Sequence, residues 1–130
     1  MRTMLLGAVL GAALLSPMAA YALTAYAGET LTVHAGPGAN FPSLVQLGTD
    51  TRLWVHGCRQ GLDWCDVSHG RMRGWVRGDR LAIRSDKGAI AEIPVASFEI
   101  RAYWEENYRR EPFYGDIGRW EAGRQVAEGQ

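Results

Sequence analysis

Residues 31–42 read LTVHAGPGANFP, and this stretch decides the fold. It begins with Leu31, Thr32 and Val33, whose apolar and polar side chains alternate as in a strand with one buried face. The two glycines at 36 and 38, with Pro37 between them, are a strong turn signal. The stretch therefore predicts a short strand that ends in a tight turn.

The pattern of short strands and turns continues to residue 84. Leu53, Val55 and Gly57 alternate with bulkier, more polar positions, which gives a clear period of two. Further short segments of this kind lie at residues 43–47, 64–68, 74–76 and 81–83. Such strands with glycine turns are typical of a small barrel or sandwich, and residues 30–84 are too few for a sandwich. We therefore expect a mainly β domain over residues 23–84, built as a small barrel of five to six short strands.

The composition sets limits on both size and partners. The chain has 130 residues, 14 basic and 14 acidic side chains and 16 glycines, and 47% of it is hydrophobic. This length fits one domain with a short appendage. A zero net charge argues against binding to nucleic acid, which normally requires a basic excess.

The N-terminus has the layout of a secretory signal peptide. A short region with Arg2 precedes an apolar run at residues 4–15, and Ala20-Tyr21-Ala22 fits the A-x-A cleavage rule. The run is shorter than the roughly 20 residues of a membrane span, so an uncleaved anchor is the weaker alternative. We expect a signal peptide at residues 1–22, no stable membrane anchor after cleavage, and a periplasmic or secreted protein.

Residues 85–130 form a C-terminal extension of a different character. Ile100, Trp104 and Tyr108 are four residues apart and would share one face of a helix. Ser97 is a candidate N-cap, and Pro112 is expected to stop the helix. We therefore predict a short helix at about residues 98–110 and a disordered end at residues 122–130.

Several motifs give the chain a resemblance to bacterial SH3 domains of the SH3b, SH3_3-like type. The opening LTVHAGPG at residues 31–38 is similar to the family's usual opening, although Thr32 and His34 stand where Asn and Arg are usual. Trp64-x-x-Val67, Gly74-Trp75-Val76 and Leu81 follow in the family's order. The resemblance covers roughly residues 26–84, and the aromatic extension resembles that of some secreted single-domain members.

The resemblance implies an SH3-like barrel of five or six strands and a non-catalytic role in the cell envelope. Members of the family commonly bind peptidoglycan peptides or a partner protein. The departures at Thr32 and His34 both affect the first loop, where hydrogen bonds typical of the family would otherwise be expected.

The two cysteines, Cys58 and Cys65, flank one predicted loop. In an exported chain we expect them to form a structural disulfide. The alternative is a metal site made by these cysteines with His56 and His69, although the usual C-x₂-C spacing is missing. A Cys–His nucleophile is a further alternative, but the chain lacks room for the larger scaffold of a cell-wall cysteine peptidase.

The aromatic residues predict an interaction surface. If Val55, Val67 and Val76 point inward, strand alternation turns Trp54 and Trp75 outward. Such a surface either binds a ligand or is covered by the tail aromatics, and we favour docking of the tail on Trp54. The candidate ligand contacts are His34, Asn40, Phe41, Trp54, Trp64 and Trp75.

Together these features predict a non-catalytic, extracytoplasmic binding module. Its expected partner is cell-wall peptide or an envelope protein, with no cofactor, metal or nucleic acid. The main alternative is an inhibitor or regulator of a partner protein such as a cell-wall hydrolase or toxin. A metal-binding or small hydrolytic protein is a second alternative.

Overall fold

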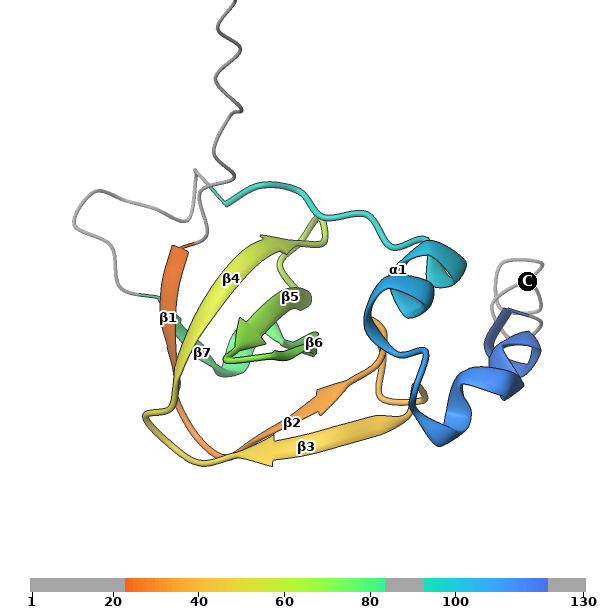
Figure 1. Cartoon of the computed structure of the whole chain (residues 1–130). Helices are drawn as coiled ribbons and strands as arrows, with labels where there is room; N and C mark the ends of the chain where they lie inside the picture. Colours follow the sequence, from red (N-terminus) through yellow and green to blue (C-terminus); the bar gives the residue numbers. More distant parts are fainter. Residues whose placement is uncertain (1–22, 84–92, 122–130) are drawn as a thin grey trace, which may run out of the picture.

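The computed structural model describes residues 23–83 and 93–121 (Figure 1). The predicted signal peptide at residues 1–22 and the predicted disordered end at residues 122–130 lie outside the described residues. Within the described residues, no helix is long and apolar enough to cross a membrane.

The fold is mainly β and consists of seven antiparallel strands in one sheet. The strands are β1 (Leu23–Ala27), β2 (Leu31–His34), β3 (Ser43–Leu47), β4 (Arg52–Cys58), β5 (Trp64–His69), β6 (Met72–Arg77) and β7 (Leu81–Ile83). Their order across the sheet is β3-β2-β6-β5-β4-β1-β7, so β3 and β7 are the two edges. The predicted count of five to six strands was too low because β1, rich in alanine, carries little strand signal of its own.

The sheet is strongly curved, and its concave side holds the main core (Figure 1). Alternate residues of each strand point inward, so that Val33, Leu53, Val55 and Val67 are fully buried together. Gly74 allows the sheet to curve at β6, because a Cβ there would collide with the side chain of Val33. The strand alternation that the sequence predicts is thus what builds this core.

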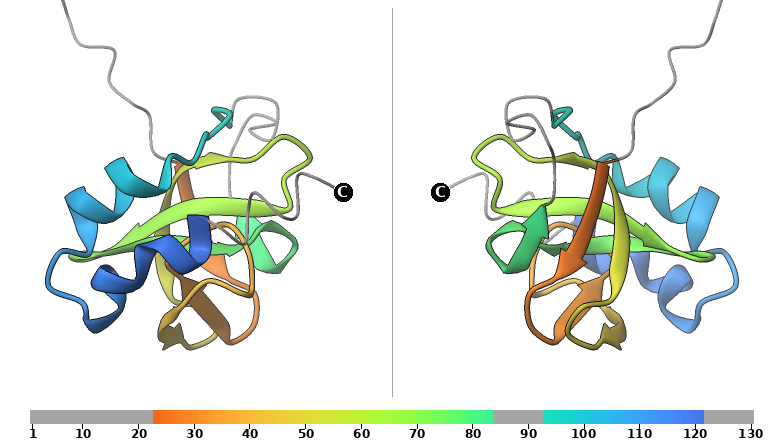
Figure 2. Two further views of the ribbon diagram at one scale, coloured as in Figure 1. Left: turned by 90° about the vertical axis from the view of Figure 1, so that its right-hand side faces the viewer. Right: turned by 90° about the vertical axis from the view of Figure 1, so that its left-hand side faces the viewer.

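The C-terminal extension packs on the outer side of the sheet (Figure 2). It contains helix α1 (Ile100–Asn107), a 3-10 helix at Pro112–Asp116 and a helical turn at residues 117–121. The short helix is confirmed, but Glu99 caps it, because the Glu99 carboxylate accepts from the backbone N–H of Arg101. Ser97 is therefore not the cap, and Pro112 starts the 3-10 helix rather than stopping α1.

A second core forms where α1 meets the first loop. Ile100, Trp104 and Tyr108 are buried against Ala35, as their spacing predicts. The Trp104 indole N–H donates to the carbonyl of Ala35 at 2.8 Å. Phe113 and Trp120 contact the ring of Trp104 from the other side. The extension is therefore an integral part of the fold.

The tail docks on Trp75, whereas we expected it to dock on Trp54. Phe98 and Tyr103 contact the ring of Trp75, which is fully buried. Trp54 lies on β4 and is 40% exposed. The difference follows from chain geometry: Val95 bridges to Cys58 at the end of β4, so the chain that continues from there meets the part of the sheet next to the first loop.

Candidate ligand-binding surface

Trp64 is the centre of a half-exposed surface on the outer side of the sheet. It lies on β5, directly opposite Arg77 of β6. The ring of His34 makes an edge-to-face contact with the Trp64 ring, with centroids 5.6 Å apart. The Nδ1 of His34 donates to the carbonyl of Phe41 at 3.0 Å, which orients the imidazole. Trp64 is thus held in a fixed position at the side of the first loop.

Two exposed ion pairs flank Trp64, one at the end of β6 and one in the loop between β4 and β5. On one side, the Arg77 guanidinium donates to the Asp79 carboxylate at 3.0 Å. On the other side, Arg59 Nε lies 4.0 Å from the Asp63 carboxylate. All four charged side chains are about half exposed or more. We call Trp64, His34 and these four residues the Trp64 surface, and it offers an aromatic ring with both signs of charge beside it.

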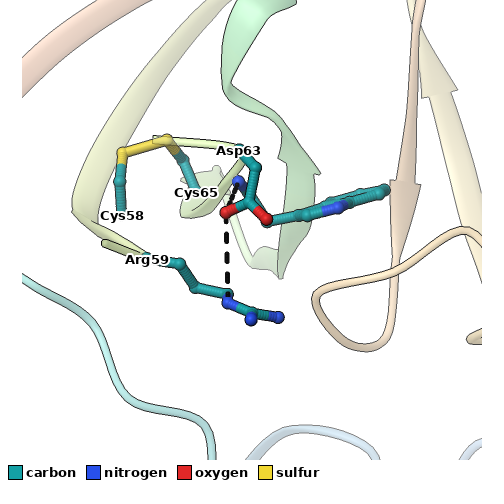
Figure 3. The surroundings of a disulfide bond; sticks show 5 residues. Cys58, Arg59, Asp63 and Cys65 are labelled. Atoms are coloured by element: carbon teal, nitrogen blue, oxygen red, sulfur yellow. Dashed lines mark hydrogen bonds and ion pairs between the residues drawn. A yellow bond between two sulfur atoms is a disulfide. The ribbon is translucent and has the colours of Figure 1, made fainter. Parts of the chain in front are cut away.

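A disulfide fixes the hairpin that carries one of these ion pairs (Figure 3). Cys58 and Cys65 are bonded and pair across β4 and β5, as predicted. Between them, the Asp63 carboxylate accepts from the backbone N–H of Trp64 at 2.9 Å. The alternative metal site with His56 and His69 does not form, because the disulfide consumes both thiols. Within the described residues, no group of three or more metal-ligating side chains comes together.

Asn40 and Phe41 border the surface but serve mainly to hold the first loop. The Phe41 ring packs closely over Gly36, where a Cβ would collide with it. The backbone carbonyl of Asn40 accepts from the Trp120 indole N–H at 2.8 Å. The extension therefore fixes the loop beside His34, and the Asn40 side chain itself stays exposed.

The six predicted contacts do not form one site. His34, Asn40, Phe41 and Trp64 lie together, but Trp75 is buried beneath the extension. Its indole N–H is buried and has no acceptor among the described residues. Trp54 lies on a separate part of the outer sheet face, over β4. Strand parity was a correct guide to the direction of these side chains, but it could not show which of them the extension covers.

A buried polar network supports the extension next to the Trp64 surface. Arg73 donates two hydrogen bonds to the Asp66 carboxylate, each of 2.8 Å. The Tyr103 hydroxyl donates to the same carboxylate at 2.6 Å, and the Tyr108 hydroxyl donates to the backbone carbonyl of Arg73. Burial raises the pKa of both tyrosines, so they remain neutral donors.

Sequence reasoning missed both this network and the two exposed ion pairs. Asp66 and Arg73 are seven residues apart and meet only because β5 and β6 form a hairpin. Strand alternation was the one signal in the sequence, because it puts Asp66 and Arg73 on the same outer face as Trp75. Their pairing with Tyr103 depends on the docking of the extension, which no local pattern encodes.

A separate polar contact joins His56 and Ser68 on the part of the outer face that the extension does not cover. The Nε2 of His56 lies 2.8 Å from the Ser68 hydroxyl oxygen. Burial, with a further effect of the nearby Arg73 charge, lowers the pKa of His56. The Asp66 carboxylate accepts from Arg73 and Tyr103, whereas the contact that orients His56 is with Ser68.

Comparison of the chain with family models, curated proteins and solved structures finds no match in any of the three.

Proposed function

We propose that this protein is a non-catalytic binding module outside the cytoplasm, with an SH3-like barrel that recognises a short cell-wall peptide through the Trp64 surface. The observation that carries the proposal is the position of Trp64 between two exposed ion pairs, Arg77–Asp79 and Arg59–Asp63.

The fold and the disulfide support the first two parts of this proposal. The curved seven-stranded antiparallel sheet encloses a core on its concave side, as an SH3-like barrel would. The GPG opening and the Gly74-Trp75-Val76 element are the motifs that resemble bacterial SH3 domains. Disulfides persist in oxidising compartments, which agrees with the signal peptide predicted at residues 1–22.

The chemistry of the Trp64 surface supports a peptide ligand. An aromatic ring offers apolar contact area at a low cost in conformational entropy. The guanidinium groups of Arg59 and Arg77 can bind carboxylates, and the carboxylates of Asp63 and Asp79 can accept from amines. Stem peptides of the cell wall carry both carboxylate and amino groups, so they complement this arrangement.

Co-sedimentation with purified peptidoglycan tests the proposal. We expect the full chain to sediment with peptidoglycan, and soluble stem peptides to compete with this binding. Trp64→Ala should lower the affinity for the stem peptide about tenfold, because stacking and burial on one indole contribute about 1–2 kcal/mol. Val45→Ala is the matched control, since Val45 is an exposed apolar residue on the edge strand β3 and does not belong to the Trp64 surface.

Two results would count against the cell-wall peptide as ligand. One is that the stem peptide competes for the Trp64→Ala variant as well as it does for the unaltered protein. The other is an absence of binding to peptidoglycan together with cross-linking to one envelope protein, which would support an inhibitor or regulator of that protein instead.

A further inference from the structure

The outer face of β4 carries an exposed tryptophan that the extension does not reach. Trp54 is 40% exposed, although it lies in the middle of the sheet rather than at an edge. Its neighbours across the strands are Thr24 on β1 and Ser68 on β5. Tryptophan is enriched at interfaces, because its ring is apolar and its N–H is polar.

The positive charge around Trp54 is not neutralised within the described residues. The Arg52 guanidinium lies over the Trp54 ring, 4.8 Å from its centroid, and Arg52 makes no ion pair with any described residue. The backbone at Arg52 is tied to the next hairpin, because His69 Nδ1 donates to the Arg52 carbonyl at 2.9 Å. Among the described residues, this face therefore offers one arginine to an anionic group.

The hydrogen-bonding groups beside Trp54 are small and neutral. Ser68 lies directly opposite Trp54, and its hydroxyl is fixed by His56 at 2.8 Å. Arg73, one strand further, is committed to the buried carboxylate of Asp66. A ligand on this face thus meets an aromatic ring, hydroxyl groups and the Arg52 guanidinium.

We propose that the face around Trp54 is a second binding site, for a carboxylate-bearing saccharide. The flat, C–H-rich face of a sugar ring stacks on an exposed indole, and its hydroxyls can exchange hydrogen bonds with Ser68 and Thr24. A carboxylate on the sugar pairs with Arg52, whose guanidinium already lies over one face of the indole. A neutral sugar would leave Arg52 without an ionic partner, and a polyanion without rings would leave Trp54 unused.

This second site is independent of the Trp64 surface. The two surfaces carry different tryptophans, and their chemistry differs: the Trp64 surface has balanced charge, whereas the Trp54 face has the single cation Arg52, which no described carboxylate neutralises. One protein with both sites could hold the glycan and the peptide of the same wall polymer. The two proposals therefore fail or succeed separately.

Titration of the full chain with peptide-free glycan strands tests the proposal. The probe is prepared by amidase digestion of peptidoglycan, which leaves a free lactyl carboxylate on each muramic acid. Chitooligosaccharides of matched length are the neutral comparison, and polyglutamate is the charged comparison without rings. We expect the acidic glycan to bind more tightly than either.

Four variants locate the binding. Trp54→Ala should weaken glycan binding by roughly tenfold, and Trp54→Phe should retain most of it. Arg52→Gln should weaken binding of the acidic glycan and leave binding of the neutral oligosaccharide unchanged. Trp64→Ala should leave glycan binding unchanged. Circular dichroism of each variant checks that the fold is intact. If Trp54→Ala unfolds the chain, the selective loss of acidic-glycan binding in Arg52→Gln tests the site instead.

The proposal is overturned if no acidic glycan binds or if Trp54→Ala binds it as tightly as the unaltered protein. Equal affinity for polyglutamate and the glycan would also overturn it, since the face would then recognise charge alone.

Discussion

Trp75 and Trp104 are both fully buried, but only one of the two indole N–H groups has an acceptor. Trp104 donates to Ala35, whereas the Trp75 N–H is unsatisfied among the described residues. An unsatisfied buried donor costs about 1–3 kcal/mol, while a formed hydrogen bond contributes about 1 kcal/mol. The same substitution by phenylalanine should therefore have different effects at the two positions.

We predict that Trp104→Phe lowers the free energy of unfolding more than Trp75→Phe does, by about 1–2 kcal/mol. Both changes remove the same volume, so the difference reports the hydrogen bond. Urea denaturation of the two variants measures it. A larger loss for Trp75→Phe would mean that the Trp75 N–H has a partner after all.

His56 should make stability depend on pH. Burial lowers its pKa in the folded state below the ordinary value of 6.5. Above pH 6.5 both states are neutral and no penalty arises. As the pH falls from 6.5 to the folded pKa, the unfolded chain takes up a proton first, so the free energy of unfolding decreases.

The variant His56→Gln isolates this effect, because glutamine can keep a hydrogen bond to Ser68 but does not titrate. We predict that the loss of stability between pH 7.5 and pH 5 is smaller in His56→Gln than in the unaltered protein. Denaturation at the two pH values tests this, and an equal loss in both proteins would assign the pH dependence to other groups.

Residue-level patterns predicted the direction of side chains well and their burial less well. Alternation around Val55 and Val67 correctly turned Trp54, Trp64 and Trp75 to the outer face. It could not distinguish the buried Trp75 from the exposed Trp54, because that difference arises from an extension that docks from more than 20 residues away in sequence.

Among the elements, the β4–β5 hairpin is the one closed by a covalent bond. The disulfide joins Cys58 and Cys65 around a short loop that contains Arg59 and Asp63. Closing a loop of this length reduces the entropy of the unfolded chain, which stabilises the fold by about 2.5 kcal/mol in the chain-entropy model.

We predict that the double change of Cys58 and Cys65 to alanine lowers the free energy of unfolding by about 2–3 kcal/mol and keeps the fold. Alanine is preferred to serine because both positions are 1% exposed, so a hydroxyl would be buried there. Reduction of the unaltered protein should give a similar loss in urea denaturation. Complete unfolding of the variant would show that the hairpin requires the bond in order to form.

The elements that sequence predicted best were those with a strong local period. The strand with Leu53, Val55 and Gly57 and the helix face of Ile100 and Trp104 have such a period, and both elements are present. β1 was missed because the two alanines in Leu23–Ala27 weaken its strand signal, and its place between β4 and β7 is set by pairing. The cap at Glu99 was missed because Ser97 is the stronger N-cap in isolation.

For the whole molecule, the curved sheet and its extension form one unit. The extension covers Trp75 and Ala35 and supplies the second core around Trp104. The Tyr103 hydroxyl of the extension also donates a hydrogen bond to the Asp66 carboxylate. An isolated helix as short as α1 is marginal in water, so sheet and extension stabilise each other.

We predict that a chain ending at residue 84 is less stable than the full chain by about 3 kcal/mol or more, which is the usual cost of losing one buried aromatic alone. Thermal unfolding of the two chains compares them. Equal unfolding temperatures would contradict the docking, and the aromatic extension would then be better explained as a partner-binding segment.

NMR titration of the full chain with a soluble stem peptide tests whether a cell-wall peptide binds at the Trp64 surface. We expect the largest shifts at the indole N–H of Trp64 and at the amides of Arg59 and Arg77. The Trp104 indole N–H, which is hydrogen-bonded to Ala35, should stay unchanged. Shifts concentrated at Trp75 and Trp104, or an absence of shifts at millimolar peptide, would contradict peptide binding at the Trp64 surface.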